Sequence, residues 1–104
     1  MHDQRALTPL LILLQSPVDA HRLVMAARGI GNLGNQAAIP ALIDLLQDAQ
    51  HPFVARIAAA QALGKLGGRL AREALERAVS ETQFSVSEAA LKALWLMEKN
   101  SWGS

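Results

Sequence analysis

Apolar residues recur along this chain with the spacing of a helix. Leucines at residues 7–14 occupy positions i, i+3, i+4 and i+7, and residues 39–46 repeat that spacing with isoleucine and leucine. One apolar stripe with this period is typical of an amphipathic helix packed on a core. Glycines that can end a helix and prolines that can begin one stand between these stripes. The pattern predicts six helices and a tail, at about 3–15, 17–30, 36–48, 52–66, 69–80, 84–99 and 100–104.

One of these helical segments is repeated. The segment at 26–34, AARGIGNLG, matches AAQALGKLG at 59–67 position by position, and the offset is 33 residues (64 − 31 = 33). A third copy at 87–94 tracks residues 56–63 at an offset of 31, but Trp95 then replaces the glycine. A period of about 33 residues predicts a solenoid in which helix pairs stack on one another.

The repeat predicts which parts of the array are unlike its middle. If the two helices of a unit are called A and B, the chain reads B, A, B, A, B, A, so half units flank two whole units. Solenoids present polar faces at their ends, yet Ile12 stands where the inner B helix has Asp44, and Trp95 stands where the inner A helix has glycine. With Met97 and Trp102, these residues predict a surface for a partner or a second copy. The alternative is that the tail covers both tryptophans.

The repeat motifs resemble those of a known family. ALGKLG at 62–67, with IPALIDLL at 39–46 in the position of the following helix, resembles the HEAT-like repeats of the phycobilisome-lyase type. The resemblance covers nearly the whole chain. It implies an all-α fold, a short α-solenoid of about six helices whose B helices line an inner surface.

The same resemblance implies several functions. Such families are mostly protein-binding scaffolds, with some bilin lyase subunits, some DNA glycosylases and one class of iron hydroxylase. The hydroxylases hold iron through His-Glu pairs, and no histidine is followed by glutamate in this sequence. The resemblance therefore does not extend to iron binding.

Composition narrows the candidate functions. Ten Lys and Arg against nine Asp and Glu give a net charge of +1, which argues against nucleic acid or an anionic membrane as partner. The chain has no cysteine, so thiolate catalysis and cysteine metal sites are excluded. The longest apolar run, Leu10–Leu14, is much shorter than the ~20 residues of a membrane span, and the first residues lack the layout of a signal peptide. We expect a cytoplasmic protein.

Candidate catalytic and ligand-binding patterns are weak. His2, His21 and His51 have no second metal ligand at helical spacing, and the carboxylates show no spacing that requires a catalytic pair. The glycine-rich segment at 29–34 follows a helix and not a strand, unlike a phosphate-binding loop. We therefore expect no catalytic residue, no metal and no cofactor.

Arg56 is a charged residue on an apolar stripe, together with Ala60 and Leu63. Such a side chain packs its stem on the neighbouring repeat and needs a partner for its head. We expect that partner to be a carboxylate of another repeat, such as Asp44 or Asp48. A role as a ligand anchor is the alternative.

The sequence thus predicts a non-catalytic protein-interaction or scaffold module of HEAT-like repeats. It would bind another protein, or a second copy, through the B-helix surface at 42–47 and 69–77 or through its ends. The alternative is an accessory subunit of a bilin lyase-like system, which rests on the resemblance alone. A weaker alternative is DNA binding by the arginines at 69–77, where interspersed glutamates favour a solvated face. The candidate partner-binding residues are Ile12, Arg69, Arg72, Arg77, Trp95, Met97 and Trp102.

Overall fold

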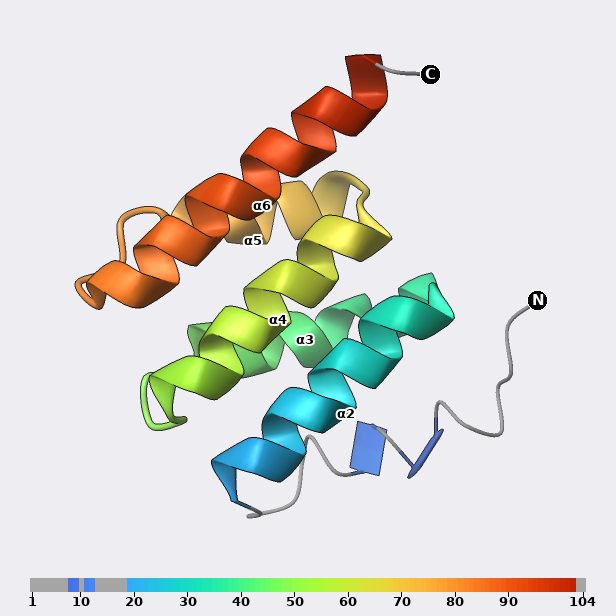
Figure 1. The fold of residues 1–104 in the computed structure, drawn as a ribbon, viewed down its shortest axis with the longest axis vertical. Coiled ribbons are helices and arrows are strands. Elements are labelled where there is room, and N and C mark those ends of the chain that lie inside the picture. Colours follow the sequence, from blue (N-terminus) through green and yellow to red (C-terminus); the bar gives the residue numbers. More distant parts are fainter. Residues whose placement is uncertain (1–7, 10, 13–18, 103–104) are drawn as a thin grey trace.

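The helices form two layers. The computed structural model describes residues 8, 9, 11, 12 and 19–102, without the side chains of residues 100–102. These residues contain helices and no strand, which confirms the predicted all-α solenoid. Helices of the A layer lie side by side in Figure 1, and those of the B layer lie behind them. The A layer is α2 (Ala20–Leu33), α4 (Phe53–Leu66) and α6 (Phe84–Trp102), and the B layer is α3 (Ile39–Gln47) and α5 (Arg69–Ala78).

Glycine and asparagine end and begin the helices as predicted. Gly34 closes α2 in the left-handed conformation at φ 72°, and Gly67 closes α4 at φ 71°. Glycine suits both positions because it has no Cβ to clash there. The Asn35 side chain accepts a hydrogen bond from the Ala37 N–H at 2.9 Å and starts the 3-10 helix Gln36–Ala38, which leads into α3.

The bounds of α2 differ from the prediction. It begins at Ala20, where the Asp19 carboxylate accepts the Arg22 N–H at 2.9 Å, and it runs to Leu33 and not only to residue 30. The predicted start at residues 16–17 lies outside the described residues. The helix continues through Gly31, where α4 packs closely against it. A Cβ on Gly31 would lie 3.2 Å from Ala62 Cα.

The start of α6 agrees with the predicted start at residue 84. The helix begins at Phe84, and the carbonyl of Gln83 accepts the N–H of Val86 and of Ser87. Ser85 therefore lies inside the first turn. Although Ser85 and Glu88 have the spacing of a capping box, Ser85 is not the N-cap residue.

Helix α4 is the centre of the core. It contacts α2 and α6 within the A layer and α3 and α5 in the B layer. Eight of its 14 residues are buried, five of them alanines, and they stand on almost every side of the helix. Because alanine is small, neighbouring helices approach α4 closely from several directions.

The glycine at one position of the A helices permits this close approach. A Cβ added to Gly64 would lie 3.0 Å from Ala93 Cβ in α6, as one added to Gly31 would crowd α4. The same repeat position in α6 is Trp95, whose side chain is exposed (60%). The last A helix therefore presents a different surface from the two before it.

The B layer buries much of what the sequence placed on a binding surface. Leu42 and Leu46 are fully buried because α3 packs against both α4 and α5, and only polar residues such as Asp44 and Gln47 are exposed at 42–47. Leu70 of α5, in contrast, is 59% exposed. Of the expected B-helix surface at 42–47, Asp44 and Gln47 are exposed and Ile43 is half-buried, whereas the leucines belong to the core.

The first predicted helix lies mostly outside the described residues. Residues 8, 9, 11 and 12 are helical, and they lie beyond α2 on the side away from α4 (Figure 1). Ile12 is exposed (57%). Of the predicted tail, residues 100–102 extend α6, and the side chain of Trp102 is outside the described part.

Candidate functional site

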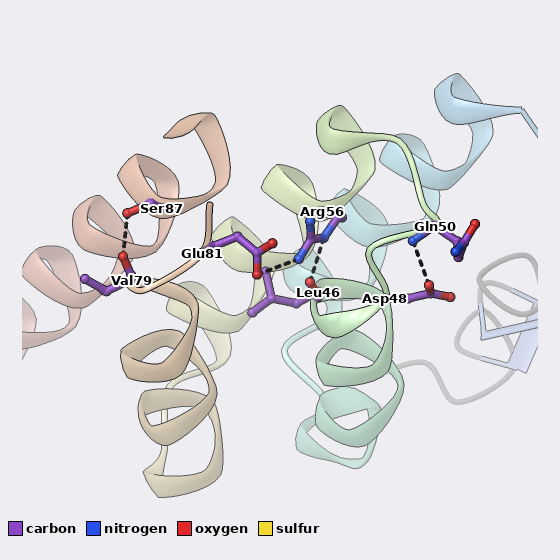
Figure 2. Close-up of polar contacts among 7 residues, drawn as sticks. All are labelled: Leu46, Asp48, Gln50, Arg56, Val79, Glu81 and Ser87. Carbon is purple, nitrogen blue, oxygen red and sulfur yellow. Dashed lines mark hydrogen bonds and ion pairs between the residues drawn. The ribbon is translucent and has the colours of Figure 1, made fainter. Parts of the chain in front are cut away.

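Arg56 is the one buried charged residue in the described part of the chain, and it is only 4% exposed. Its Nε donates to the Leu46 carbonyl at 2.8 Å, and its Nη2 lies 3.0 Å from Glu81 Oε2 (Figure 2). Leu46 is in the last turn of α3, where carbonyls have no intrahelical partner and carry partial negative charge. The guanidinium therefore ties α4 to the end of α3 and to the loop after α5. Its donors serve the fold, which makes a ligand anchor a poor fit.

The predicted carboxylate partners of Arg56 were wrong, although a carboxylate, that of Glu81, does pair with it. Asp44 is exposed on α3. Asp48 accepts the Gln50 N–H at 2.9 Å and lies 3.4 Å from the His51 ring nitrogen, so it stabilises its own turn. Glu81 is the partner because the loop that follows α5 passes the buried end of the Arg56 side chain (Figure 2).

Ser87 makes the contact that corresponds to the Arg56–Leu46 hydrogen bond, one unit later. It aligns with Arg56 at an offset of 31 (87 − 56), and its hydroxyl donates to the Val79 carbonyl at 2.7 Å (Figure 2). Val79 in turn aligns with Leu46 at an offset of 33 (79 − 46). In both A helices, a side chain of the first turn thus donates a hydrogen bond to a carbonyl at the end of the preceding B helix. The alignment of the repeats places both partners of this contact at corresponding positions, and this is the signal that the sequence carries for it.

Two grooves run along α4 on the outer face of the A layer. The groove between α2 and α4 has a volume of about 320 Å³, and the one between α4 and α6 has about 590 Å³. The apolar lining of the larger groove comes from Ile57, Ala89, Ala93 and Leu96. Each groove is lined only by A helices, so the B layer contributes nothing to it.

Charged side chains lie along the larger groove. Lys65, Lys92 and Glu88 are all exposed at its lining, which leaves an excess of one positive charge. Lys65 Nζ also donates to Asn32 Oδ1 at 2.9 Å, which draws this lysine toward α2. The groove therefore combines an apolar base with a weakly basic edge.

Sequence reasoning missed this groove, although one residue could have indicated it. Leu96 occupies the repeat position held by Lys65 and by Asn32 in the earlier units (96 − 65 = 31, 65 − 32 = 33). In the last unit an apolar residue thus stands where each of the two earlier units has a polar residue. That replacement makes the base of the groove between α4 and α6 more apolar.

The structure brings three of the predicted partner-binding residues together. Arg69, Arg72 and Met97 line a hollow of about 570 Å³ beside the turn at Gly67 and Gly68. Met97 is partly buried against the core, and Arg69 Nε lies 3.3 Å from Glu73 Oε2. Two of the three side chains are thus already engaged within the chain.

The other predicted residues are dispersed. Arg77 lines a separate hollow of about 230 Å³, which also contains Glu81. Trp95 is exposed on α6, and Lys99 Nζ lies 5.1 Å from the centre of its ring. Met97, two residues later, packs toward the core, so the two residues do not form one surface. Ile12 is exposed in the segment before α2, far along the chain from the other predicted residues.

The described residues contain neither a cluster of metal-binding side chains nor a helix that could cross a membrane. No group of three or more His, Asp or Glu residues in that part of the chain is placed to hold a metal ion. None of the described helices has the length and apolar character needed to cross a bilayer.

Comparison with known proteins agrees with the repeat pattern. A family model described as HEAT repeats matches residues 3–95. The structure of human deoxyhypusine hydroxylase in complex with glycerol is similar, with a TM-score of 0.88 at 23% sequence identity. The match covers 94% of this chain but only 34% of that one, and at this identity it shows the fold alone. No curated protein sequence matches the chain.

Proposed function

We propose that this chain, which belongs to the HEAT-repeat family, is a non-catalytic module that binds another protein in the groove between α4 and α6. The observation that carries the proposal is the groove itself. Its volume of about 590 Å³ and its apolar base suit a short segment of a partner protein. Ile57 and Leu96 are its largest apolar residues.

The lining defines the chemistry of the bound segment. An apolar side chain would pack on Ile57 and Leu96, which removes apolar surface of both partners from water. An acidic side chain beside it would lie near Lys65 and Lys92. We therefore propose a partner segment that carries an apolar residue and a carboxylate within about one helical turn of each other.

The groove is a better candidate than the B layer. The leucines that the sequence placed on the B-helix surface, Leu42 and Leu46, are buried, so the exposed surface at 42–47 is polar. Leu70 is an exposed apolar residue of α5, but it lines none of the four hollows described above. An isolated exposed leucine is common on protein surfaces and needs no partner.

A displayed library of random peptides tests the proposal. Peptides selected on the 104-residue chain should share an apolar residue next to Asp or Glu. They should lose binding at least about tenfold when Leu96→Glu disrupts the apolar base, and several-fold with Lys92→Glu. Leu70→Glu is the matched control, because it places the same charge on another exposed leucine (59%, against 49% for Leu96) away from the groove. Equal binding by all three variants would overturn the proposal.

Two alternatives remain distinguishable from it. An accessory role in bilin attachment requires a change in visible absorption when the chain is mixed with a bilin. DNA binding by Arg69, Arg72 and Arg77 requires a mobility shift that disappears when all three become Glu, and it should weaken steeply with salt. We propose neither, because Arg69 already pairs with Glu73 and the net charge is only +1.

A further inference from the structure

Helix α6 carries an exposed apolar stripe that points away from the rest of the molecule. Phe84, Leu91 and Trp95 are all exposed, and they fall at i, i+7 and i+11, which places them on one face of the helix. The opposite face packs on α4 and α5 through the buried residues Ala89, Ala90 and Ala93. The stripe is therefore separate from both the core and the base of the groove.

This stripe does not match the contact by which the A helices stack on one another. In the stack, Gly31 faces Ala62 and Gly64 faces Ala93. The helices are so close that an added Cβ would lie 3.2 Å from Ala62 or 3.0 Å from Ala93. The same repeat position in α6 holds Trp95. A helix that packs on the stripe must lie farther from α6 than α6 lies from α4, since the distance between helix axes grows with the side chains between them.

Charged residues flank the stripe in a self-complementary order. Glu88 lies near its beginning and Lys99 near its end, both on the same side of the stripe and both exposed. They are eleven residues apart (99 − 88), about 16 Å along a helix axis. They are therefore too far apart to pair with each other within one chain.

We propose that two copies of this chain associate through an antiparallel pairing of their α6 helices. With the twofold axis between residues 93 and 94, Glu88 of each copy lies level with Lys99 of the second copy. Trp95 then lies between the levels of Leu91 and Trp95 of the second copy. This register packs Leu91 and Trp95 of one copy against those of the other and forms two symmetric Glu88–Lys99 pairs, as a twofold interface requires. The proposal does not depend on the function proposed for the groove.

The molar mass in solution, measured over a concentration series, tests the association. We expect the wild-type chain to change from monomer to dimer as concentration rises, and Trp95→Ala to raise the dissociation constant about tenfold or more, because a central tryptophan often dominates such contacts. Leu70→Ala, which truncates an equally exposed residue of α5, should leave it unchanged. A wild-type monomer throughout, or a dimer unaffected by Trp95→Ala, would overturn the proposal.

Charge reversal tests the pairing. Glu88→Lys alone and Lys99→Glu alone should each weaken the dimer several-fold, because like charges then face each other. The double variant should restore the affinity to within about twofold of its wild-type value, since the pairs re-form with the signs exchanged. Lys99→Glu removes the contact with Trp95 in both the single and the double variant, so the restoration reports only the pairing. Failure of the double variant to recover would contradict this register.

Cross-linking tests the direction of the helices, and the chain suits it because it contains no cysteine. An equimolar mixture of Glu88→Cys and Lys99→Cys chains should form a mixed disulfide, since the two positions lie opposite each other in the antiparallel pair. Glu88→Cys alone should form little, because the two copies of residue 88 would be about 16 Å apart. Efficient cross-linking of Glu88→Cys with itself would indicate a parallel pair and overturn the proposed arrangement.

Discussion

Helices α4 and α6 occupy the same position in successive units, yet they have opposite surroundings. Ala60 of α4 is fully buried, whereas its counterpart Leu91 of α6 is exposed, and Gly64 of α4 corresponds to the exposed Trp95. The middle helix combines small residues with neighbours on all sides, and the last helix combines large apolar residues with an open face. In this array the size of the residue at a given repeat position thus depends on whether another helix packs against that position.

The two helices share one contact, which each makes with the B helix before it. Each ties its first turn to the end of the preceding B helix, α4 through Arg56 and α6 through Ser87 (Figure 2). In α4 the contact is made by the charged side chain of Arg56, which reaches two segments. In α6 it is made by the short hydroxyl side chain of Ser87. The contact between an A helix and the B helix of the unit before it is therefore kept, while the surface of the A helix changes.

Transferring the tryptophan of α6 into α4 should have the largest effect. In Gly64→Trp the new Cβ would lie 3.0 Å from Ala93 Cβ, and the ring would have no space between the helices. We expect a loss of about 3 kcal/mol or more in the free energy of unfolding, measured by urea denaturation. Gln61→Trp, one turn earlier at the exposed groove, is the control and should cost far less. Equal losses would mean that α4 and α6 are not held at this distance.

Removing the buried guanidinium should have the next largest effect. Arg56→Ala leaves Glu81 and the Leu46 carbonyl without their partner, and we expect it to cost about 2–3 kcal/mol in the free energy of unfolding. Glu81 is partly exposed and can regain water, which keeps the loss at this level. Arg28→Ala, at an exposed arginine of α2, should change stability by less than about 0.5 kcal/mol.

The corresponding change in α6 should have a smaller effect. Ser87→Ala removes one hydroxyl bond to the Val79 carbonyl, at a site that is only partly buried. We expect a loss of about 1 kcal/mol in the same denaturation experiment. Ser87→Thr, which keeps the hydroxyl, should retain most of that stability. If Ser87→Ala cost as much as Arg56→Ala, the two ties would not differ in the way their burial indicates.

Truncating Trp95 should have the smallest effect on the folded monomer. The side chain is exposed, so we expect Trp95→Ala to change the free energy of unfolding by less than about 0.5 kcal/mol. The measurement belongs at low protein concentration, because association stabilises the folded state by mass action. A loss above about 1 kcal/mol would place the ring against the core of its own chain, contrary to its exposure.

The sequence by itself determined the repeat, the two kinds of helix and the glycines that close them. These features depend on residues close together in the chain, since a helical stripe, a cap and a left-handed glycine involve only a few neighbouring positions. The same local pattern placed Arg56 on a buried stripe and predicted that it would need a carboxylate. It also showed Trp95 in the place of a glycine.

Only the tertiary structure decided what these elements pack against. Glu81, and not Asp44 or Asp48, pairs with Arg56 because of the path of the loop after α5. The groove between α4 and α6 arises from the distance between two helices that are separated by α5 in the chain. Helix packing directs Met97 to the core and Trp95 outward. Such contacts join segments far apart in sequence, and their geometry depends on packing of the whole array, which no local pattern contains.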